Sequence, residues 1–152
     1  LGKFKVGIMV ETPSIAATMA DLKGVVDFIS VGTNDLSQYL FAADRMNPAL
    51  GTLLNPWQPG LIRTLARIAA DAAEAGVSSG VCGESASDPA FAVVLAGLGM
   101  KSVSSSPSQV QAVRAALSAV SMDQAREIAQ AVLTATTAEE AKSLATKLLK
   151  AL

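Results

Sequence analysis

The chain has 152 residues, of which 51% are hydrophobic, so it can bury a core of its own. Its net charge of −1 gives no electrostatic reason to expect nucleic acid or an anionic membrane as a partner. No apolar run reaches the roughly 18–20 residues that cross a bilayer. The chain has no histidine, so any phosphohistidine chemistry belongs to another segment or another protein. The single cysteine excludes an internal disulfide and fits a reducing cytoplasm.

Short apolar runs alternate with longer segments of helical spacing along the first 120 residues. The predicted strands are residues 5–10, 25–31, 77–81 and a short run at Val103. The predicted helices are residues 14–22, 61–75, 89–96 and 107–119, with a long polar connection between 35 and 61. Gly76 is expected to end the helix before it. The N-terminal stretch lacks a small-residue cleavage site, so it indicates a strand rather than a signal peptide.

The alternation predicts an α/β fold with a parallel sheet. Four strand–helix units fit either an open doubly wound sheet or half of a (β/α)8 barrel, which needs eight units and about 250 residues. After residue 120 only helices are expected, one capped by Ser121 and one opening at Thr137 with capping-box spacing. We therefore expect residues 1–120 to form the strand-containing unit and residues 121–152 a helical cap.

Polar side chains follow the predicted strands, at the edge where parallel α/β folds bind ligands. Glu11 and Asp35 come after consecutive strands, so their carboxylates could share Mg²⁺ or Mn²⁺, completed by water and substrate oxygens. Each carboxylate could instead cap a helix, and the residues alone leave both interpretations open.

Three further features of this edge could bind an anion or move a proton. The segment Gly32-Thr33-Asn34-Asp35 could offer backbone N–H groups at a helix N-terminus, although it is neither a P-loop nor a GxGxxG motif. Arg45 could hold a phosphate through two hydrogen bonds, although a lone loop arginine is more often solvated. Cys82 is either an inert small hydrophobic residue or a proton donor or nucleophile.

Four segments carry a resemblance to a known family, in matching order and spacing. They are Gly7-Ile8-Met9-Val10-Glu11-Thr12-Pro13, Gly32-Thr33-Asn34-Asp35-Leu36-Ser37-Gln38-Tyr39, Ala43-Asp44-Arg45-Met46-Asn47 and Cys82-Gly83-Glu84. Together they resemble the phosphoenolpyruvate-binding C-terminal domain of Enzyme I of the bacterial sugar phosphotransferase system. Pyruvate phosphate dikinase and phosphoenolpyruvate synthase share much of this pattern, whereas Tyr39 and residues 43–47 are closer to Enzyme I. The resemblance implies the second half of a (β/α)8 TIM barrel.

The resemblance also implies roles for individual residues. Glu11 and Asp35 match the Mg²⁺ ligands of the family. Asn34, the backbone near Asp35, and Arg45 match the groups that hold the phosphate of phosphoenolpyruvate. Cys82 matches the acid that protonates the enolate when pyruvate forms. These roles agree with the general chemistry of phosphoryl transfer, in which Mg²⁺ and arginine neutralise the charge of the transferring group.

The family's phosphorylated histidine is absent from this chain, so the resemblance implies a fragment that is inactive alone. Its parent would pass phosphate from phosphoenolpyruvate to a histidine, release pyruvate and serve a phosphocarrier histidine protein. The alternatives are a fragment of a dikinase or synthase relative, and a non-catalytic half-barrel that self-associates through open sheet edges and an apolar inner face. We expect a homodimer in the cytoplasm. The run Ser104-Ser105-Ser106 departs from the family, which has a larger apolar residue among these serines.

Overall fold

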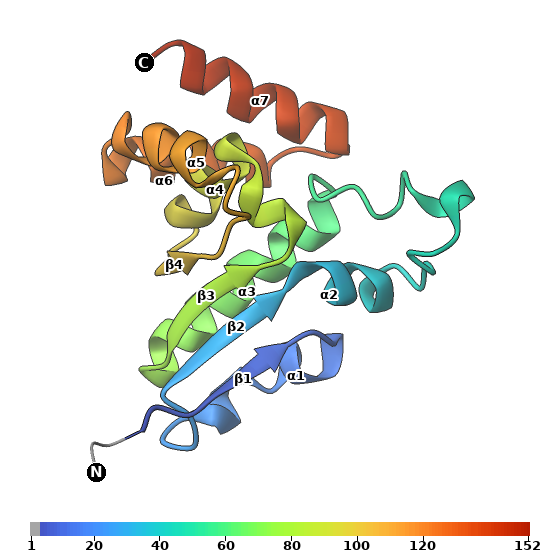
Figure 1. Cartoon of the computed structure of the whole chain (residues 1–152), viewed down its shortest axis with the longest axis vertical. Helices are drawn as coiled ribbons and strands as arrows, with labels where there is room; N and C mark the ends of the chain where they lie inside the picture. The colour runs from blue at the N-terminus through green and yellow to red at the C-terminus, as the bar shows by residue number, and fades with distance from the viewer. Residues whose placement is uncertain (1–3) are drawn as a thin grey trace.

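A four-stranded parallel sheet organises the protein. The computed structural model describes residues 4–152. The first three residues of the predicted unit 1–120 lie outside this range. The strands β1 (Gly7–Val10), β2 (Phe28–Gly32), β3 (Ser78–Cys82) and β4 (Ser102–Val103) are neighbours in chain order. The arrowheads of β1, β2 and β3 point toward the same edge (Figure 1). The predicted α/β fold with a parallel sheet is confirmed.

Helices follow every strand. After β1 come α1 (Pro13–Ala17) and the 3₁₀ helix η1 (Met19–Leu22); after β2 come α2 (Thr33–Leu40), η2 (Pro48–Leu50) and α3 (Pro59–Ala75). After β3 come η3 (Glu84–Ser87) and α4 (Pro89–Gly97), and after β4 come α5 (Val110–Ser118), α6 (Met122–Leu133) and α7 (Ala138–Lys150). Within residues 4–152, none of these helices combines the length and the apolar character needed to cross a membrane.

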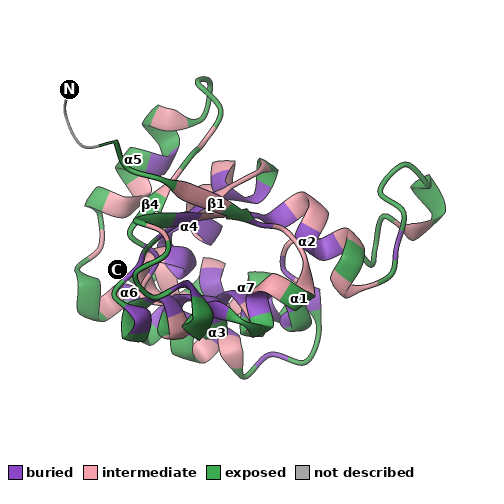
Figure 2. Cartoon of the chain, turned by 90° about the horizontal axis from the view of Figure 1, so that it is seen from below, coloured by how far each residue is buried: buried purple, intermediate pink, exposed green. Residues whose placement is uncertain are grey.

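The helices leave one face of the sheet open. Strand side chains buried under the helices are Val10, Ile29, Val31 and Val81. On the opposite face Met9 and Phe28 are 45% and 40% exposed. Met9 pairs with Ser30, and Ser30 pairs with Gly80, so small residues lie beside Met9 on this open face. Figure 2 shows β1 in the colours of intermediate and exposed residues, while purple gathers among the helices.

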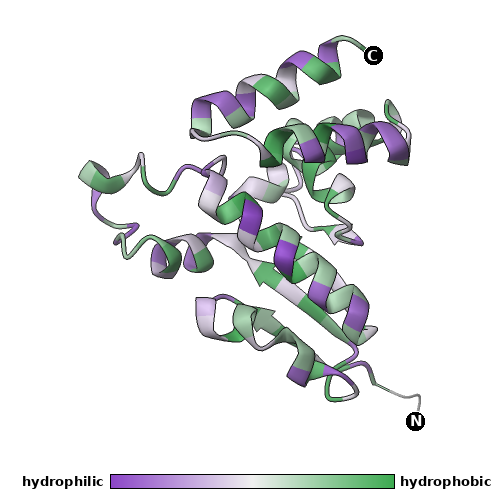
Figure 3. Ribbon diagram, turned by 180° about the vertical axis from the view of Figure 1, so that it is seen from behind, coloured by the Kyte–Doolittle hydropathy of each residue, from purple (hydrophilic) through white to green (hydrophobic). Residues whose placement is uncertain are grey.

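The long helix α3 covers the back of the sheet. Its apolar residues recur at helical spacing, so Leu61, Leu65, Ile68 and Ala72 all lie on one fully buried stripe. The alternate stripes of polar and apolar residues along α3 are visible from behind (Figure 3). Gly76 adopts φ 73° and ends the helix, as predicted, because a left-handed C-cap suits a residue without a side chain.

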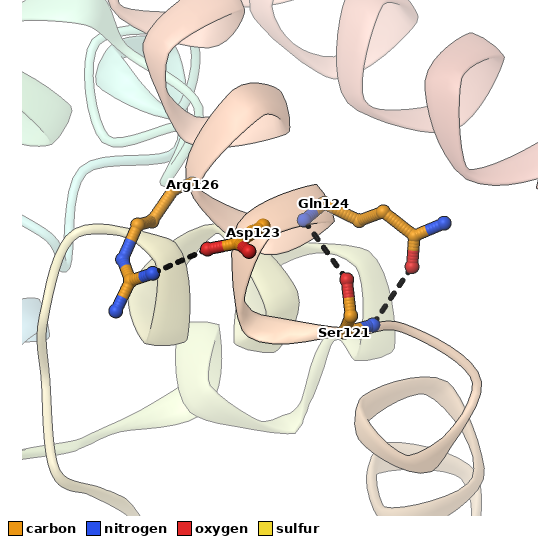
Figure 4. A network of polar contacts seen from close by, with 4 residues as sticks. All are labelled: Ser121, Asp123, Gln124 and Arg126. Carbon is orange, nitrogen blue, oxygen red and sulfur yellow. Dashed lines mark hydrogen bonds and ion pairs between the residues drawn. The ribbon is translucent and has the colours of Figure 1, made fainter.

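The helical layer consists of α4, α6 and α7. Residues 91–95 of α4 are all fully buried, because α4 packs against β4 on one side and against α5, α6 and α7 on others. Ser121 caps α6 as predicted, accepting from the Gln124 backbone N–H at 3.2 Å while the Gln124 side chain accepts from the Ser121 N–H at 2.8 Å. Figure 4 shows this capping box beside the Asp123–Arg126 ion pair.

The predicted capping box of α7 is only half formed. The Thr137 hydroxyl accepts from the Glu140 backbone N–H at 3.1 Å, as the spacing requires. The Glu140 carboxylate, however, accepts from the backbone N–H and the hydroxyl of Thr136, at 2.8 and 2.9 Å. The reciprocal bond is therefore made one residue before the N-cap, and both donors of Thr136 are satisfied by one carboxylate oxygen.

Four predicted elements differ from the structure. The strand expected at 25–31 begins only at Phe28. The helix expected at 14–22 breaks at Thr18, whose hydroxyl bonds back to the carbonyls of Ser14 and Ile15 and competes with the helix. The connection expected between 35 and 61 overlaps α2, which buries Thr33, Leu36 and Ser37. The helix expected at 107–119 begins only at Val110.

Candidate active site

The carboxyl ends of β1, β2 and β3 form the candidate site. We call the residues that end or follow these strands, Glu11, Asn34, Asp35 and Cys82, the rim. The register pairs Val10 with Val31 and Gly32 with Cys82, so β2 and β3 end level with each other and β1 ends one residue earlier. Parallel pairing thus brings together residues that are 71 positions apart in the sequence, from Glu11 to Cys82.

Glu11 lies across the end of β2. A Cβ atom placed on Gly32 would overlap the Oε1, Cγ and Cδ atoms of Glu11, so the Glu11 side chain fills the space that a larger residue would need. Gly32 also neighbours Cys82 in the sheet. The absence of a side chain at Gly32 therefore allows the Glu11 carboxylate to reach over β2, and Glu11 forms no cap on α1, whose N-cap is Thr12.

Asp35 and Arg45 are brought together by the fold. Asp35 lies in the first turn of α2, where the helix dipole favours a negative charge. Its Oδ1 is 3.4 Å from Nη1 of Arg45, and the two side chains are 36% and 48% exposed. The chain turns back after α2 at Ala42, which has φ 49°, and the Arg45 backbone N–H donates to Oε1 of Gln38 at 3.1 Å. Gln38 thus helps to place Arg45 above the helix that precedes it.

A cavity of about 670 Å³ opens beside this pair. Asn34 and Arg45 line it together with Glu84, while Leu54 and Leu61 supply part of its apolar wall. The other rim residues do not line it. The two groups predicted to hold phosphate therefore share one cavity, whose polar lining also includes the carboxylates of Glu84 and Asp88.

Cys82 is half-buried at the last position of β3. Its thiol donates to the carbonyl oxygen of Val31 at 3.5 Å, and its own carbonyl accepts from the Thr33 hydroxyl at 3.1 Å. Gly83 follows with φ 100°, and a Cβ there would lie 2.6 Å from Oγ1 of Thr33 and 3.2 Å from Oδ1 of Asn34. The turn after β3 therefore runs close against the start of α2, which requires glycine at this position.

Several residues around the rim were missed by the sequence prediction. Thr33 and Ser85 are both buried, and their hydroxyl oxygens lie 2.6 Å apart. Asp88 caps α4 and accepts from the Trp57 indole N–H at 3.3 Å, which fixes the end of the 41–58 connection. The Asp88-Pro89 pair, an N-cap residue followed by proline at N1, was the available signal for Asp88. Nothing in the sequence indicated the Thr33–Ser85 contact, which depends on the sheet register.

The residues that could bind a metal are two carboxylates, Glu11 and Asp35. Within residues 4–152 no group of three or more His, Cys, Asp or Glu side chains converges as a metal site. Oxygen ligands from two carboxylates, with water and substrate oxygens in the other positions, are the donor set that Mg²⁺ accepts. The space over Gly32, which holds the Glu11 carboxylate, is consistent with this use of the rim.

Comparison with known proteins gives a consistent result. The family model described as "PEP-utilising enzyme, PEP-binding domain" matches residues 2–122. A phosphoenolpyruvate-protein phosphotransferase of Streptomyces coelicolor is 46% identical over 142 residues, which cover 93% of this chain and 25% of that protein. One from Geobacillus stearothermophilus is 41% identical over 140 residues, covering 91% of this chain and 24% of that protein.

A third relative has a different name. The multiphosphoryl transfer protein 1 of Escherichia coli is 36% identical over 140 residues, which cover 92% of this chain and 17% of that protein. The chain thus spans a quarter or less of the length of each of these relatives.

Proposed function

This chain belongs to the family of PEP-utilising enzymes, matching its PEP-binding domain, and we propose that it forms part of a phosphoenolpyruvate–protein phosphotransferase. In this proposal residues 1–120 are the second half of a (β/α)8 barrel, and residues 121–152 cap it. The four parallel strands in chain order, each followed by a helix, support the half-barrel. A chain with a single thiol fits the reducing cytoplasm, where we place the protein.

The placement of Asn34, Asp35 and Arg45 carries the proposal. These residues form one polar cluster at the start of α2, where a guanidinium, an amide and a helix N-terminus can hold a phosphate. Glu11 and Asp35 would hold Mg²⁺, which supplies positive charge to the phosphoryl oxygens and the enolate. The same cluster would orient phosphoenolpyruvate so that its C3 carbon, and not the bridging oxygen, lies toward the Cys82 thiol.

Cys82 would complete the reaction. The P–O bond of phosphoenolpyruvate breaks as a P–N bond forms at a histidine outside this chain, since the chain has no histidine. The enolate that leaves takes the thiol proton of Cys82 at its C3 carbon and becomes pyruvate. The thiolate then recovers a proton from water. A phosphocarrier histidine protein would receive the phosphoryl group from the parent's own histidine.

Isothermal titration of the chain with phosphoenolpyruvate, with and without Mg²⁺, tests the proposal. We expect binding that requires the metal and disappears when Glu11→Ala and Asp35→Ala are combined. A matched control combines Asp71→Ala with Glu74→Ala, which removes two carboxylates from the outer side of α3, including one in an ion pair. Metal-dependent binding that survives the Glu11 and Asp35 changes would refute the assignment of these ligands. A folded chain that binds nothing would show that these residues do not suffice for a phosphoenolpyruvate site.

A second candidate function is self-association of a non-catalytic half-barrel. Phe4, Val6, Met9, Val25 and Phe28 are all at least 40% exposed, and all five belong to β1, β2 or the segments just before these strands. Exposed apolar side chains at an open strand edge favour pairing between chains. Sedimentation should therefore detect a dimer that Phe28→Ser weakens. A monomer at every concentration would exclude this function.

A dikinase or synthase relative would use the same rim with another phosphoryl acceptor. Two of the three relatives reported above are named phosphoenolpyruvate-protein phosphotransferase, which favours the phosphotransferase over this alternative. Assay of acceptors with the full-length parent separates the two.

A further inference from the structure

A chain of two buried hydroxyl groups connects the starts of α2 and η3. Thr33 and Ser85 are only 2% and 5% exposed, and their oxygens are 2.6 Å apart although the residues are 52 positions apart. Thr33 also donates to the Cys82 carbonyl at 3.1 Å. A hydroxyl has one proton, so once Thr33 donates to Cys82, the bond between the two hydroxyls must use the proton of Ser85. The chain therefore runs in one direction, from Ser85 to Thr33 to the Cys82 carbonyl.

The hydroxyl chain restrains the backbone of Cys82, which carries the thiol. Gly83, immediately after Cys82, has φ 100°, and glycine has wide backbone freedom, so it does not by itself restrain this segment. Thr33 retains it by bonding the Cys82 carbonyl, while the thiol itself bonds only the Val31 carbonyl, at the long distance of 3.5 Å. Both anchors of Cys82 belong to β2 and the start of α2, the same segment that carries Asn34 and Asp35. The direction of the thiol is thereby fixed relative to the phosphate-binding side of the rim.

We propose that Thr33 and Ser85 are positioning residues that set the direction of the Cys82 thiol. Thr33 acts directly on the Cys82 carbonyl, and Ser85 acts through Thr33 by orienting its hydroxyl. The consequence for proton transfer to C3 of the enolate rests on the proposed function. The effect on the thiol does not, because it follows from the hydrogen bonds of the chain itself.

Alkylation of the intact chain with iodoacetamide tests this proposal, because Cys82 is its only thiol. The rate is measured by mass spectrometry over a range of pH, in native buffer, for wild type and variants. Thr33→Val keeps the shape of the side chain and removes the hydroxyl. We expect it to change the alkylation rate about two- to tenfold, the effect of losing one net hydrogen bond on a local equilibrium. Thr33→Ser restores the hydroxyl and should return the rate to the wild-type value. Ser85→Ala should change the rate in the same direction as Thr33→Val, by a smaller factor.

Ser121→Ala is the matched control. It removes a hydroxyl that caps α6 and so lowers stability, but Ser121 has no contact with the rim. Its alkylation rate should equal that of wild type. Equal rates in Thr33→Val and wild type, with a lower melting temperature, would overturn the proposal and leave the hydroxyls a purely stabilising role. Failure of Thr33→Ser to restore the rate would overturn it as well.

The alkylation experiment depends neither on the folding of one variant nor on ligand binding. If Thr33→Val does not fold, Ser85→Ala carries the test, since it removes only the outer hydroxyl, and an unchanged rate would then refute the proposal. Phosphoenolpyruvate takes no part in the measurement. A folded chain that fails to bind it in the titration would show that the rim residues do not suffice for a phosphoenolpyruvate site, and would leave the positioning result intact.

Discussion

The rim and the helical layer differ in how far their side chains are buried and in how many of their interactions lie within the chain. In the helical layer, the five residues 91–95 of α4 are fully buried and α6 begins with a complete capping box. At the rim, the Asp35–Arg45 ion pair is 36% and 48% exposed, and the neighbouring open face of the sheet leaves Met9 and Phe28 in solvent. One region completes its interactions within the chain, and the other presents groups that another molecule can use.

This difference indicates where the free energy of folding resides. Close packing of α4 against α6 and α7 excludes water from apolar surface, which is the main stabilising contribution in a small domain. Exposed ion pairs contribute little, because water screens them and two long side chains must be held in place. Substitutions in the helical layer should therefore lower stability, whereas substitutions at the rim should lower ligand binding and leave stability almost unchanged.

The largest effect is expected for Gly97→Ala, where α4 crosses α6. A Cβ at this position would overlap the backbone carbonyl of Ala125 and lie 2.8 Å from the Cβ of Ala129, and a backbone carbonyl cannot rotate away. We expect a loss of about 3 kcal/mol in the free energy of unfolding, at the upper end of the usual cost of overpacking. Denaturation in urea, followed by circular dichroism, measures it.

Gly51→Ala provides the matched control for this substitution. Gly51 has φ −56° and ψ −31°, which any residue adopts, and an added Cβ would approach only the Pro48 carbonyl, at 3.4 Å. Its effect should stay within about 0.5 kcal/mol, as for most surface substitutions. Equal stabilities of Gly97→Ala and Gly51→Ala would show that α4 and α6 can move apart freely and that the helical layer is not the stable region.

A smaller effect on folding is expected at the rim. Asp35→Asn keeps the size of the side chain and removes the charge that pairs with Arg45. Without ligand it should change the free energy of unfolding by about 0.5 kcal/mol or less, the usual value of an exposed ion pair. In wild type, Mg²⁺ together with phosphoenolpyruvate should raise stability through binding to the folded state, by about 2.7 kcal/mol when the ligand is at 100 times its Kd.

Asp35→Asn should abolish this ligand-dependent gain, and the same urea titration with and without the ligands measures both quantities. A loss of more than about 1 kcal/mol in the absence of ligand would exceed what an exposed pair contributes. Such a result would contradict the distinction between the two regions, because it would make Asp35 a structural residue.

The sheet and most helices could be predicted from the sequence because their signals are local. Apolar runs marked β1 and β2, and Gly76 and Ser121 marked a helix end and a helix start. The strand at Val103 was expected but has only two residues, since the serines around it supply no apolar surface to bury. Helix α2 was missed because Asn34 and Asp35 in its first turn are residues typical of loops.

The rim could be predicted as a set of residues but not as a geometry. Strand ends identified Glu11, Asp35 and Cys82, since polar residues followed apolar runs. The Asp35–Arg45 ion pair depends on the turn at Ala42, and alanine gives no signal for a left-handed backbone. The roles of these residues in metal, phosphate and proton binding stay predictions, which the titration and the alkylation experiment address.

The smallest effect is expected for Glu140, at the start of α7 in the helical layer. The pKa of Glu140 is lowered, first by the backbone N–H of Thr136 and then by the Thr136 hydroxyl, both of which donate to its carboxylate. Because the folded-state pKa lies below the unfolded one, this stabilisation is complete above the ordinary pKa of glutamate and is lost as the pH falls through the lowered value. Glu140→Gln should therefore have a lower melting temperature than wild type at neutral pH, and the two melting temperatures should converge in acid.

Glu139→Gln is the matched control. It removes an equal charge from the same helical turn without touching Thr136, so the difference between the two variants measures the hydrogen bonds without the dipole effect. A pH dependence that is the same for both variants would assign the effect to the helix dipole alone, and the carboxylate of Glu140 would then stabilise α7 no more than its neighbour does.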